Sequence, residues 1–311
     1  MRAVFLGTPE IAVPSLERMI VAGHDVALVV TQPDRPKGRG HALAAPPVKL
    51  AALAHGIEVY QPERVRRPEA VEKLRAARAD VMAIIAFGQI IPQTIIDLVP
   101  HGIINVHASL LPKYRGAAPI QWAIANGETV TGVTTMRIDA GLDTGDMLLK
   151  AELAIGPDET AEELAARIAV LGADLLVGTL DGLARGAIVP QKQDDAEATH
   201  APILKKEDGW LDWKQPARML HNRVRGFNPW PGGWTRFRGQ TLHIWRTRAA
   251  EDAPVFEPGL LARHGKRWFA GSAGPALELL EVQLEGKKRV TAQEFANGQR
   301  LSGNEFLEAH P

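Results

Sequence analysis

Two polar side chains lie two residues apart in residues 102–107, which read GIINVH. The apolar residues before them predict a strand that is buried on both faces. Since alternate residues of a strand leave the same face, Asn105 and His107 are expected to act on one site. The carboxyl end of a parallel strand is where sheets of this kind bind ligands, so we expect the site there.

A second polar cluster follows a predicted strand over Val133 to Ile138. Asp139, Asp143 and Asp146 lie in this cluster, and two glycines between them predict a tight turn. One of the three carboxylates is expected to reach His107. An amide, an imidazole and a carboxylate suit acyl transfer onto an external nucleophile, because they stabilise an oxyanion and move protons without a covalent intermediate.

Each of these residue types also has an ordinary structural role. A single histidine near a strand end is most often a hydrogen-bonded structural residue, asparagine commonly caps turns, and Asp-Gly sequences are common in turns. Taken singly, the structural interpretation is preferable for each residue. Taken together, and with no competing group elsewhere in the chain, they favour an active site.

Other catalytic signatures are missing from the sequence. Residues 7–10 (GTPE) follow the first predicted strand and form neither a dinucleotide fingerprint nor a phosphate loop. None of the four serines lies in a G-x-S-x-G elbow, and the ten histidines form no H-E-x-x-H motif. The chain has no cysteine, which excludes thiol nucleophiles, zinc ribbons and disulfides. We therefore expect no metal.

The elements that must position these residues alternate between strand and helix along the first two thirds of the chain. Apolar runs predict strands over residues 1–6, 26–30, 57–60, 81–86 and 103–106, and periodic patterns predict helices over 48–53, 68–78 and 158–183. Thr8 is expected to cap the first helix, with Pro9 at its first position and Gly23 after its end. This alternation predicts a doubly wound, Rossmann-like α/β domain with a mostly parallel sheet.

Beyond about Lys205 the pattern changes to short alternating stretches, such as 241–245, 268–270 and 277–280, separated by glycine-containing turns. They predict a small OB-like β-barrel, preceded by one helix over 216–225. We therefore divide the chain into a catalytic domain at 1–188, a linker at 189–206 and a barrel domain at 207–311.

Formal charge separates the two parts, although the 36 basic and 36 acidic residues cancel over the whole chain. Residues 1–204 carry a net charge of −5 and residues 205–311 carry +5. Tryptophans lie among the basic residues of 205–248, as on surfaces that hold a nucleic-acid backbone. The alternative is an ordinary solvated surface, and the sequence favours the two interpretations about equally.

The remaining composition suggests a compartment. The segment before Glu10 carries one basic residue and does not resemble a signal peptide, and no run of about 18 apolar residues predicts a membrane span. With no cysteine in the chain, a reducing compartment is expected, and we predict a cytoplasmic protein.

The sequence also resembles a known family across nearly its whole length. It resembles the 10-formyltetrahydrofolate-dependent formyltransferases, and most closely those that act on methionyl-tRNA. The stretches that carry this resemblance are 7–10 (GTPE), 31–40 (TQPDRPKGRG), 86–92 (AFGQIIP), 105–112 (NVHASLLP), 115–120 (RGAAPI), 142–146 (LDTGD) and 227–231 (FNPWP).

The resemblance implies roles for individual residues. It implies that Asn105, His107 and Asp143 form the catalytic trio. It also implies that the folate co-substrate, 10-formyltetrahydrofolate, contacts a turn at 109–112 and that residues 86–92 help to enclose its pterin. The contacts it implies are Ser109, Leu110, Leu111, Pro112, Phe87, Gly88 and Ile90.

The implied partner is the initiator methionyl-tRNA, with no membrane and with the chain acting as a monomer. The loop from Thr31 to Leu43 would face this tRNA, and Arg39 would be its essential residue. The basic residues assigned to tRNA binding are Arg39, Lys37, Lys205, Lys206 and Arg223.

Three alternatives stay open from the sequence. A related formyltransferase that acts on an amino sugar would not need the +5 second domain. A hydrolase of formyl-folate would use the same trio with water as the nucleophile. An RNA-binding module with a vestigial α/β domain would bind RNA without any transfer.

Overall fold

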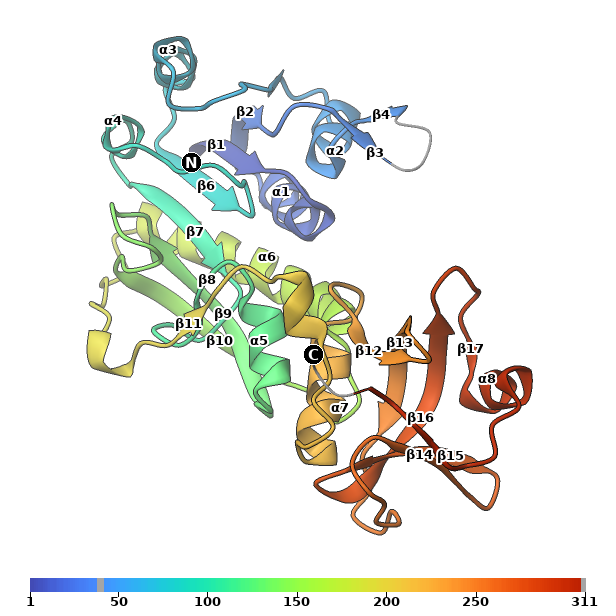
Figure 1. The fold of residues 1–311 in the computed structure, drawn as a ribbon. Coiled ribbons are helices and arrows are strands. Elements are labelled where there is room, and N and C mark those ends of the chain that lie inside the picture. The colour runs from blue at the N-terminus through green and yellow to red at the C-terminus, as the bar shows by residue number, and fades with distance from the viewer. Residues whose placement is uncertain (38–41, 309–311) are drawn as a thin grey trace. The chain divides into compact units, whose positions relative to one another are not determined.

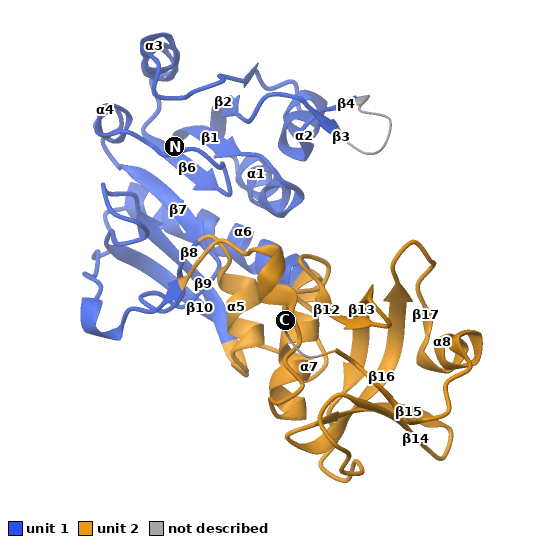
Figure 2. Cartoon of the chain, in the orientation of Figure 1, with its two compact units in different colours: residues 1–116, 131–153, 165–200 blue, residues 117–130, 154–164, 201–311 orange. Residues whose placement is uncertain are grey.

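The computed structural model describes residues 1–37 and 42–308, which form two compact units. Figure 2 colours residues 1–116, 131–153 and 165–200 as the first unit and residues 117–130, 154–164 and 201–311 as the second. The second unit therefore includes two segments that lie within the first two thirds of the sequence.

The first unit is built on a seven-stranded sheet in the order β10-β9-β7-β6-β1-β2-β5 (Figure 1). Its strands are β1 (Arg2–Gly7), β2 (Asp25–Val30), β5 (Val59–Tyr60), β6 (Val81–Ile85), β7 (Ile103–His107), β9 (Val130–Arg137) and β10 (Met147–Ala154). The pairs β1–β2, β1–β6, β2–β5 and β6–β7 are parallel, and β9 runs antiparallel to β7. The predicted doubly wound domain with a mostly parallel sheet is confirmed.

Helices cover both faces of this sheet, as the strand pattern requires. In β1, Ala3 and Phe5 pack on one side and Val4 and Leu6 on the other, and all four are fully buried. The first core includes residues of α1, α2 and α6, and the second includes residues of α3 and α4. These helices are α1 (Val13–Val21), α2 (Pro47–Ala54), α3 (Pro68–Ala76), α4 (Gln93–Ile96) and α6 (Ala161–Ala184).

The expected start of the first helix is wrong. A short 3-10 turn covers Glu10–Ala12, and α1 begins at Val13, so Pro9 precedes the turn instead of opening a helix. The Thr8 hydroxyl caps neither element, because it donates a hydrogen bond to the carbonyl oxygen of Phe87 at 3.1 Å. Thr8 therefore ties the end of β1 to the segment after β6.

The loop predicted to face RNA contains a small hairpin. Strands β3 (Arg35–Lys37) and β4 (Ala42–Ala44) pair antiparallel, with Arg35 opposite Ala44. Arg39 lies outside the described residues. Further short elements are β8 (Arg115–Gly116), β11 (His200–Ala201) and the 3-10 turns Asp195–Glu197 and Lys206–Gly209.

The second unit contains an antiparallel sheet in the order β12-β13-β16-β15-β14-β18, with β17 paired to β16. The amide of Glu308, after β18, donates to the carbonyl oxygen of Arg236 in β12 at 2.9 Å, so the two end strands meet. The predicted change to an antiparallel β-domain in the last third of the chain is confirmed. The strands are β12 (Gly233–Phe237), β13 (Gln240–Arg248), β14 (Leu260–His264), β15 (Arg267–Ser272), β16 (Gly274–Leu284), β17 (Val290–Thr291) and β18 (Glu305–Phe306).

Three helices belong to the second unit: α5 (Pro119–Ala125), α7 (Ala217–Gly226) and α8 (Ala292–Gln299). Helices α5 and α7 approach closely at Gly226, where a Cβ atom would lie 2.8 Å from the Ala125 nitrogen and 2.9 Å from the Gln121 oxygen. Glycine is therefore required at this crossing. Within the described ranges, every helix is too short or too polar to span a lipid bilayer.

Candidate functional site

Strand β7 places Asn105 and His107 on one face near its carboxyl end. Asn105 pairs with Ile84 of β6 and with Met136 of β9, and His107 pairs with Thr134 of β9. The site is therefore built on a strand that neighbours hold on both sides, as the sequence predicts.

His107 is 5% exposed and is held from two directions. Its Nε2 lies 2.9 Å from the carbonyl oxygen of Tyr114, and its Nδ1 lies 3.7 Å from Oδ2 of Asp143. Because a carbonyl only accepts hydrogen bonds, the contact with Tyr114 assigns a hydrogen to Nε2. The carboxylate then faces the other ring nitrogen.

Asp143 is the carboxylate that the structure places beside His107. It lies in the loop between β9 and β10, its side chain is 14% exposed, and its Oδ2 accepts a hydrogen bond from the Gly116 amide at 2.9 Å. Asp139 instead accepts hydrogen bonds from Gly141 and Thr144 inside the loop.

Asn105 is half-buried, and its side-chain amide makes no hydrogen bond to residues 1–37 or 42–308. An amide has two N–H donors and one acceptor oxygen, and in a half-buried residue these groups can reach a bound ligand. The Asn105 amide is therefore available to a substrate beside the His107–Asp143 pair.

The turn expected to contact folate is tightly bonded within the protein. The Ser109 side chain is fully buried, and its hydroxyl donates to the Lys113 carbonyl at 2.6 Å. The Leu111 amide donates to Oγ1 of Thr134 at 3.1 Å, and the Leu111 carbonyl accepts from Nζ of Lys150 at 2.6 Å. The backbone of Leu111 is thus fully used, while Leu110 is half-buried and Pro112 is buried.

The second segment that the sequence predicts to contact folate follows the end of β6. Phe87 is buried, Gly88 has φ +84°, and Ile90 exposes 91% of its surface. A cavity of about 470 Å³ adjoins this segment. Its lining includes Thr8, Gln32, Arg35, Phe87 and Gly88, together with Pro9, Pro33, Pro36, Pro46 and Pro47.

The residues expected to contact RNA have different environments. Lys205 and Lys206 are exposed, and Nζ of Lys206 lies 5.7 Å from the ring centre of Trp234. Arg223 is half-buried, because its guanidinium donates to the Asp208 carbonyl at 2.8 Å and lies over the ring of Phe227. Lys37 is the last residue of β3.

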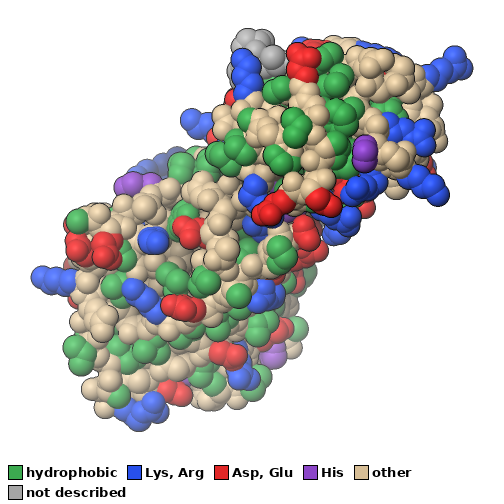
Figure 3. Space-filling model, turned by 90° about the horizontal axis from the view of Figure 1, so that it is seen from below, with side chains coloured by type: hydrophobic (Ala, Val, Ile, Leu, Met, Phe, Trp, Pro, Cys, Tyr) green, Lys and Arg blue, Asp and Glu red, His purple; other side chains and the backbone are tan. Residues whose placement is uncertain are grey.

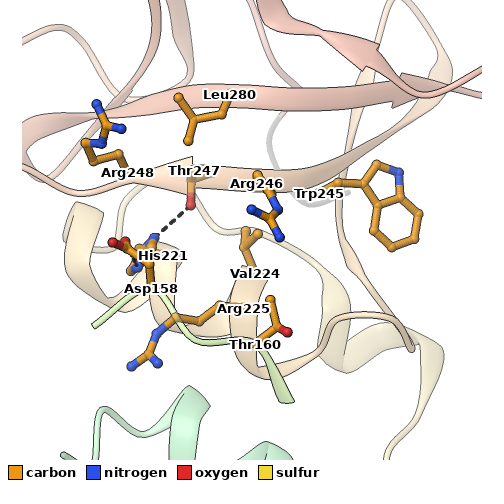
Figure 4. A pocket seen from close by; sticks show the side chains of 10 residues that line it. All are labelled: Asp158, Thr160, His221, Val224, Arg225, Trp245, Arg246, Thr247, Arg248 and Leu280. Atoms are coloured by element: carbon orange, nitrogen blue, oxygen red, sulfur yellow. Dashed lines mark hydrogen bonds and ion pairs between the residues drawn. The ribbon is translucent and has the colours of Figure 1, made fainter. Parts of the chain in front are cut away.

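A further hollow of about 180 Å³ in the second unit contains more basic groups. Figure 4 shows His221 of α7 facing Thr247 of β13, with Asp158 beside it. Burial lowers the pKa of His221, and its ring nitrogens contact Oγ1 of Thr247 at 2.9 Å and the Pro157 carbonyl at 3.1 Å. The arginines lining the hollow are Arg225, Arg246 and Arg248.

One face of the molecule carries side chains of both charges (Figure 3). Over the face in view in Figure 3, Lys and Arg side chains alternate with Asp and Glu.

Sequence reasoning missed the residues that hold the histidine in place. The Tyr114 amide donates a hydrogen bond to Oγ1 of Thr199 at 2.9 Å. Thr199 is 92 residues from His107 and falls in the segment predicted to be a linker, so no local pattern could connect the two.

Comparisons with known proteins point to one family for both the N-terminal and the C-terminal parts of the chain. The family model described as formyl transferase matches residues 1–180, and the model described as formyl transferase, C-terminal domain, matches residues 203–300. A curated methionyl-tRNA formyltransferase of Solibacter usitatus (strain Ellin6076) is 67% identical over 311 residues, which cover 100% of both chains.

Two solved structures support the fold. HypX from Aquifex aeolicus, in complex with tetrahydrofolic acid, matches with a TM-score of 0.65 at 16% identity, covering 100% of this chain and 51% of that chain. The chain thus spans about half the length of HypX. A methionyl-tRNA formyltransferase from Clostridium thermocellum matches with a TM-score of 0.56 at 17% identity over 81% of this chain and 95% of that chain. At these identities, both similarities concern the fold alone.

Proposed function

The chain belongs to the formyl transferase family, and we propose that it transfers the formyl group of 10-formyltetrahydrofolate to the free α-amino group of initiator methionyl-tRNA. The products are N-formylmethionyl-tRNA, which serves translation initiation, and tetrahydrofolate. The observation that carries this proposal is the unpartnered Asn105 amide beside the His107–Asp143 pair, all on one end of β7 and the adjacent loop.

The reaction needs an oxyanion donor. The neutral α-amine attacks the formyl carbon, and negative charge develops on the formyl oxygen. The Asn105 amide has free N–H groups at the end of β7 and donates one of them to that oxygen. Strand β7 is paired with β6 and β9, so the backbone that carries this amide is fixed before substrate binds.

Protons must also move, since the amine loses one and N10 of the folate gains one. His107 carries a hydrogen on Nε2, which it donates to the Tyr114 carbonyl. Asp143 faces Nδ1 and stabilises the positive charge that the imidazole gains when it takes a second proton. The imidazole can then relay the proton toward N10.

The folate is proposed to contact the turn Ser109, Leu110, Leu111 and Pro112 and the segment that contains Phe87, Gly88 and Ile90. The internal bonds of Ser109 and Leu111 support a rigid wall for a flat heterocycle, and the exposed Ile90 offers apolar surface that a ligand would cover.

The tRNA is proposed to contact the basic second part of the chain, through Lys205, Lys206 and Arg223, and the loop that contains Lys37 and Arg39. We retain the division into a catalytic domain at 1–188, a linker at 189–206 and a tRNA-binding domain at 207–311. Since every residue of the trio comes from one unit of one chain, a monomer is the proposed active form, and the cytoplasm its compartment.

Incubation with 10-formyltetrahydrofolate and separately charged tRNAs tests this function. Formyl transfer to methionyl-tRNA, and not to other aminoacyl-tRNAs or amino sugars, is expected. Formate release without any tRNA would instead support a hydrolase, and tight RNA binding without transfer would support an RNA-binding module.

A further inference from the structure

The backbone of Asp143 has an unfavourable conformation that other contacts must stabilise. Its φ is +54°, in the left-handed region that residues other than glycine seldom adopt. The neighbouring Gly141 and Leu142 are exposed, so little packing holds this part of the loop. Other contacts must therefore fix the Asp143 carboxylate near His107.

Gln193 supplies two of these contacts. Its Nε2 donates hydrogen bonds to the carbonyl oxygens of Asp143 and Gly145, both at 2.8 Å. A primary amide has two N–H groups, so one side chain satisfies both carbonyls. Gln193 thus clamps the backbone on both sides of Thr144.

Arg115 fixes the orientation of that clamp. Its Nε donates to Oε1 of Gln193 at 3.0 Å, which leaves Nε2 facing the loop, and its Nη2 lies 2.8 Å from Oδ1 of Asp195. Arg115 is 5% exposed, so its guanidinium is held in one place. The next residue, Gly116, donates its amide to the Asp143 carboxylate at 2.9 Å.

These contacts close a ring. Arg115 and Gly116 are adjacent in sequence, and they reach Asp143 by two routes: Arg115 through Gln193 to the Asp143 carbonyl, and Gly116 directly to the carboxylate. The ring fixes both the backbone and the side chain of the same residue. A movement of either would change the 3.7 Å separation between Asp143 and His107.

We propose that Gln193 is a positioning residue for the formyl-transfer reaction, acting through Asp143 and held by Arg115. This inference rests on the proposed function, because it requires Asp143 to act in catalysis. The contacts of Gln193 are with Arg115, Asp143 and Gly145, and it is not among the residues proposed to contact folate or tRNA, so it is expected to affect the rate of transfer and not the binding of either substrate.

A double-mutant cycle tests the proposal. The single-turnover rate of formyl transfer is measured for the unmodified chain, Gln193→Ala, Asp143→Asn and the double variant, with both substrates saturating. Gln193→Ala is expected to lower the rate roughly 10- to 100-fold, as a displacement of about 1 Å at a reacting group does. In the Asp143→Asn background the same change is expected to cost less than about 3-fold, because no charged carboxylate remains to be positioned.

Two further variants separate positioning from general structure. Gln193→Glu keeps the acceptor for Arg115 but loses both N–H donors, so it is expected to match Gln193→Ala and not the unmodified chain. Gln191→Ala changes an exposed glutamine of the same segment and is expected to stay within about 2-fold of the unmodified rate. KM for both substrates is expected to change little in the Gln193 variants.

Equal rate losses from Gln193→Ala in both backgrounds would overturn the proposal, as would a Gln193→Glu enzyme with the unmodified rate. Failure of the proposed function looks different, because the unmodified chain would then form no formylmethionyl-tRNA at all.

Discussion

Asp143 brings a negative charge to a buried imidazole from a loop in which the four residues before it, 139–142, are exposed. The Gly116 amide bonds the same Oδ2 that faces His107, so the carboxylate is both fixed and partly neutralised. The carboxylate thus lies between the Gly116 amide and the His107 imidazole, so little side-chain entropy is lost when its charge stabilises the imidazole.

Asp143→Asn removes the negative charge of the side chain and keeps nearly the same side-chain shape. Asparagine tolerates positive φ, and its amide oxygen can still accept the Gly116 amide, so the fold is expected to persist. The rate of formyl transfer is expected to fall on the order of 100-fold or more, as the loss of a proton-transfer partner does. Initial rates, together with the unfolding temperature, check this, and an unfolding temperature near that of the unmodified chain is the control. A near-normal rate would remove Asp143 from the mechanism.

Local periodicity was enough to pair Asn105 with His107, because both lie on one strand at a spacing of two. It could not select Asp143 from three carboxylates. That selection depends on the positive φ of Asp143 and on contacts from Gly116 and Gln193, which are 27 and 50 residues away.

At the scale of elements, the crossing of α5 and α7 depends on one missing side chain. Gly226 ends α7 where the backbone of α5 passes within reach of a Cβ atom, and backbone atoms cannot move aside as a flexible side chain can. The two helices can pack at this distance only with glycine at that position.

Gly226→Ala is therefore expected to lower the free energy of unfolding by about 1–3 kcal/mol, the usual cost of overpacking. Denaturation in urea measures the change. Gly298→Ala in α8 is the matched control, because no atom lies within 4 Å of its added Cβ, and it is expected to be neutral or slightly stabilising. Equal destabilisation by both substitutions would contradict the packing argument.

His221 of α7 gives stability a dependence on pH. Burial lowers its pKa below the ordinary value of 6.5, so the unfolded chain binds more protons than the folded chain just below that value. Stability from this group is therefore present above about pH 6.5 and falls as the pH drops toward the folded pKa. The urea midpoint is expected to fall less between about pH 7.5 and pH 5.5 in His221→Gln than in the unmodified chain. An unchanged dependence on pH would contradict this assignment.

Among the elements, long periodic segments were predicted well. Helix α6 was expected over 158–183 and covers Ala161–Ala184, and α7 was expected over 216–225 and covers Ala217–Gly226. Helix α5 was missed, since its seven residues are too few to establish a period. The start of α1 was misplaced, because Thr8 bonds to Phe87, a partner 79 residues away.

At the scale of the whole molecule, the net charge of zero is the sum of two parts of the chain with opposite net charges. The +5 charge of residues 205–311 favours a polyanion, and the −5 charge of residues 1–204 opposes non-specific binding elsewhere. The fold class was readable from the order of strands and helices, but the two units were not. Residues 117–130 and 154–164 join the second unit through contacts that no local pattern records.

Binding of methionyl-tRNA is expected to weaken as salt rises, because phosphate contacts release counterions. Lys206→Glu is expected to weaken binding and to reduce the slope of log affinity against log salt by about 1. Equilibrium binding over a series of salt concentrations measures both. Arg64→Glu makes the same charge change at an exposed residue of the first unit and is the control. An equal change of slope in both variants would contradict a tRNA surface on the second unit.

The central claim is that the free amide of Asn105 stabilises the formyl oxygen during transfer. The most direct measurement is the single-turnover rate of formyl transfer to methionyl-tRNA by Asn105→Leu, with both substrates saturating. A fall of roughly 100-fold or more is expected, with the unfolding temperature close to that of the unmodified chain, since the amide makes no bond within the described protein. A rate within a few-fold of the unmodified chain would contradict the claim.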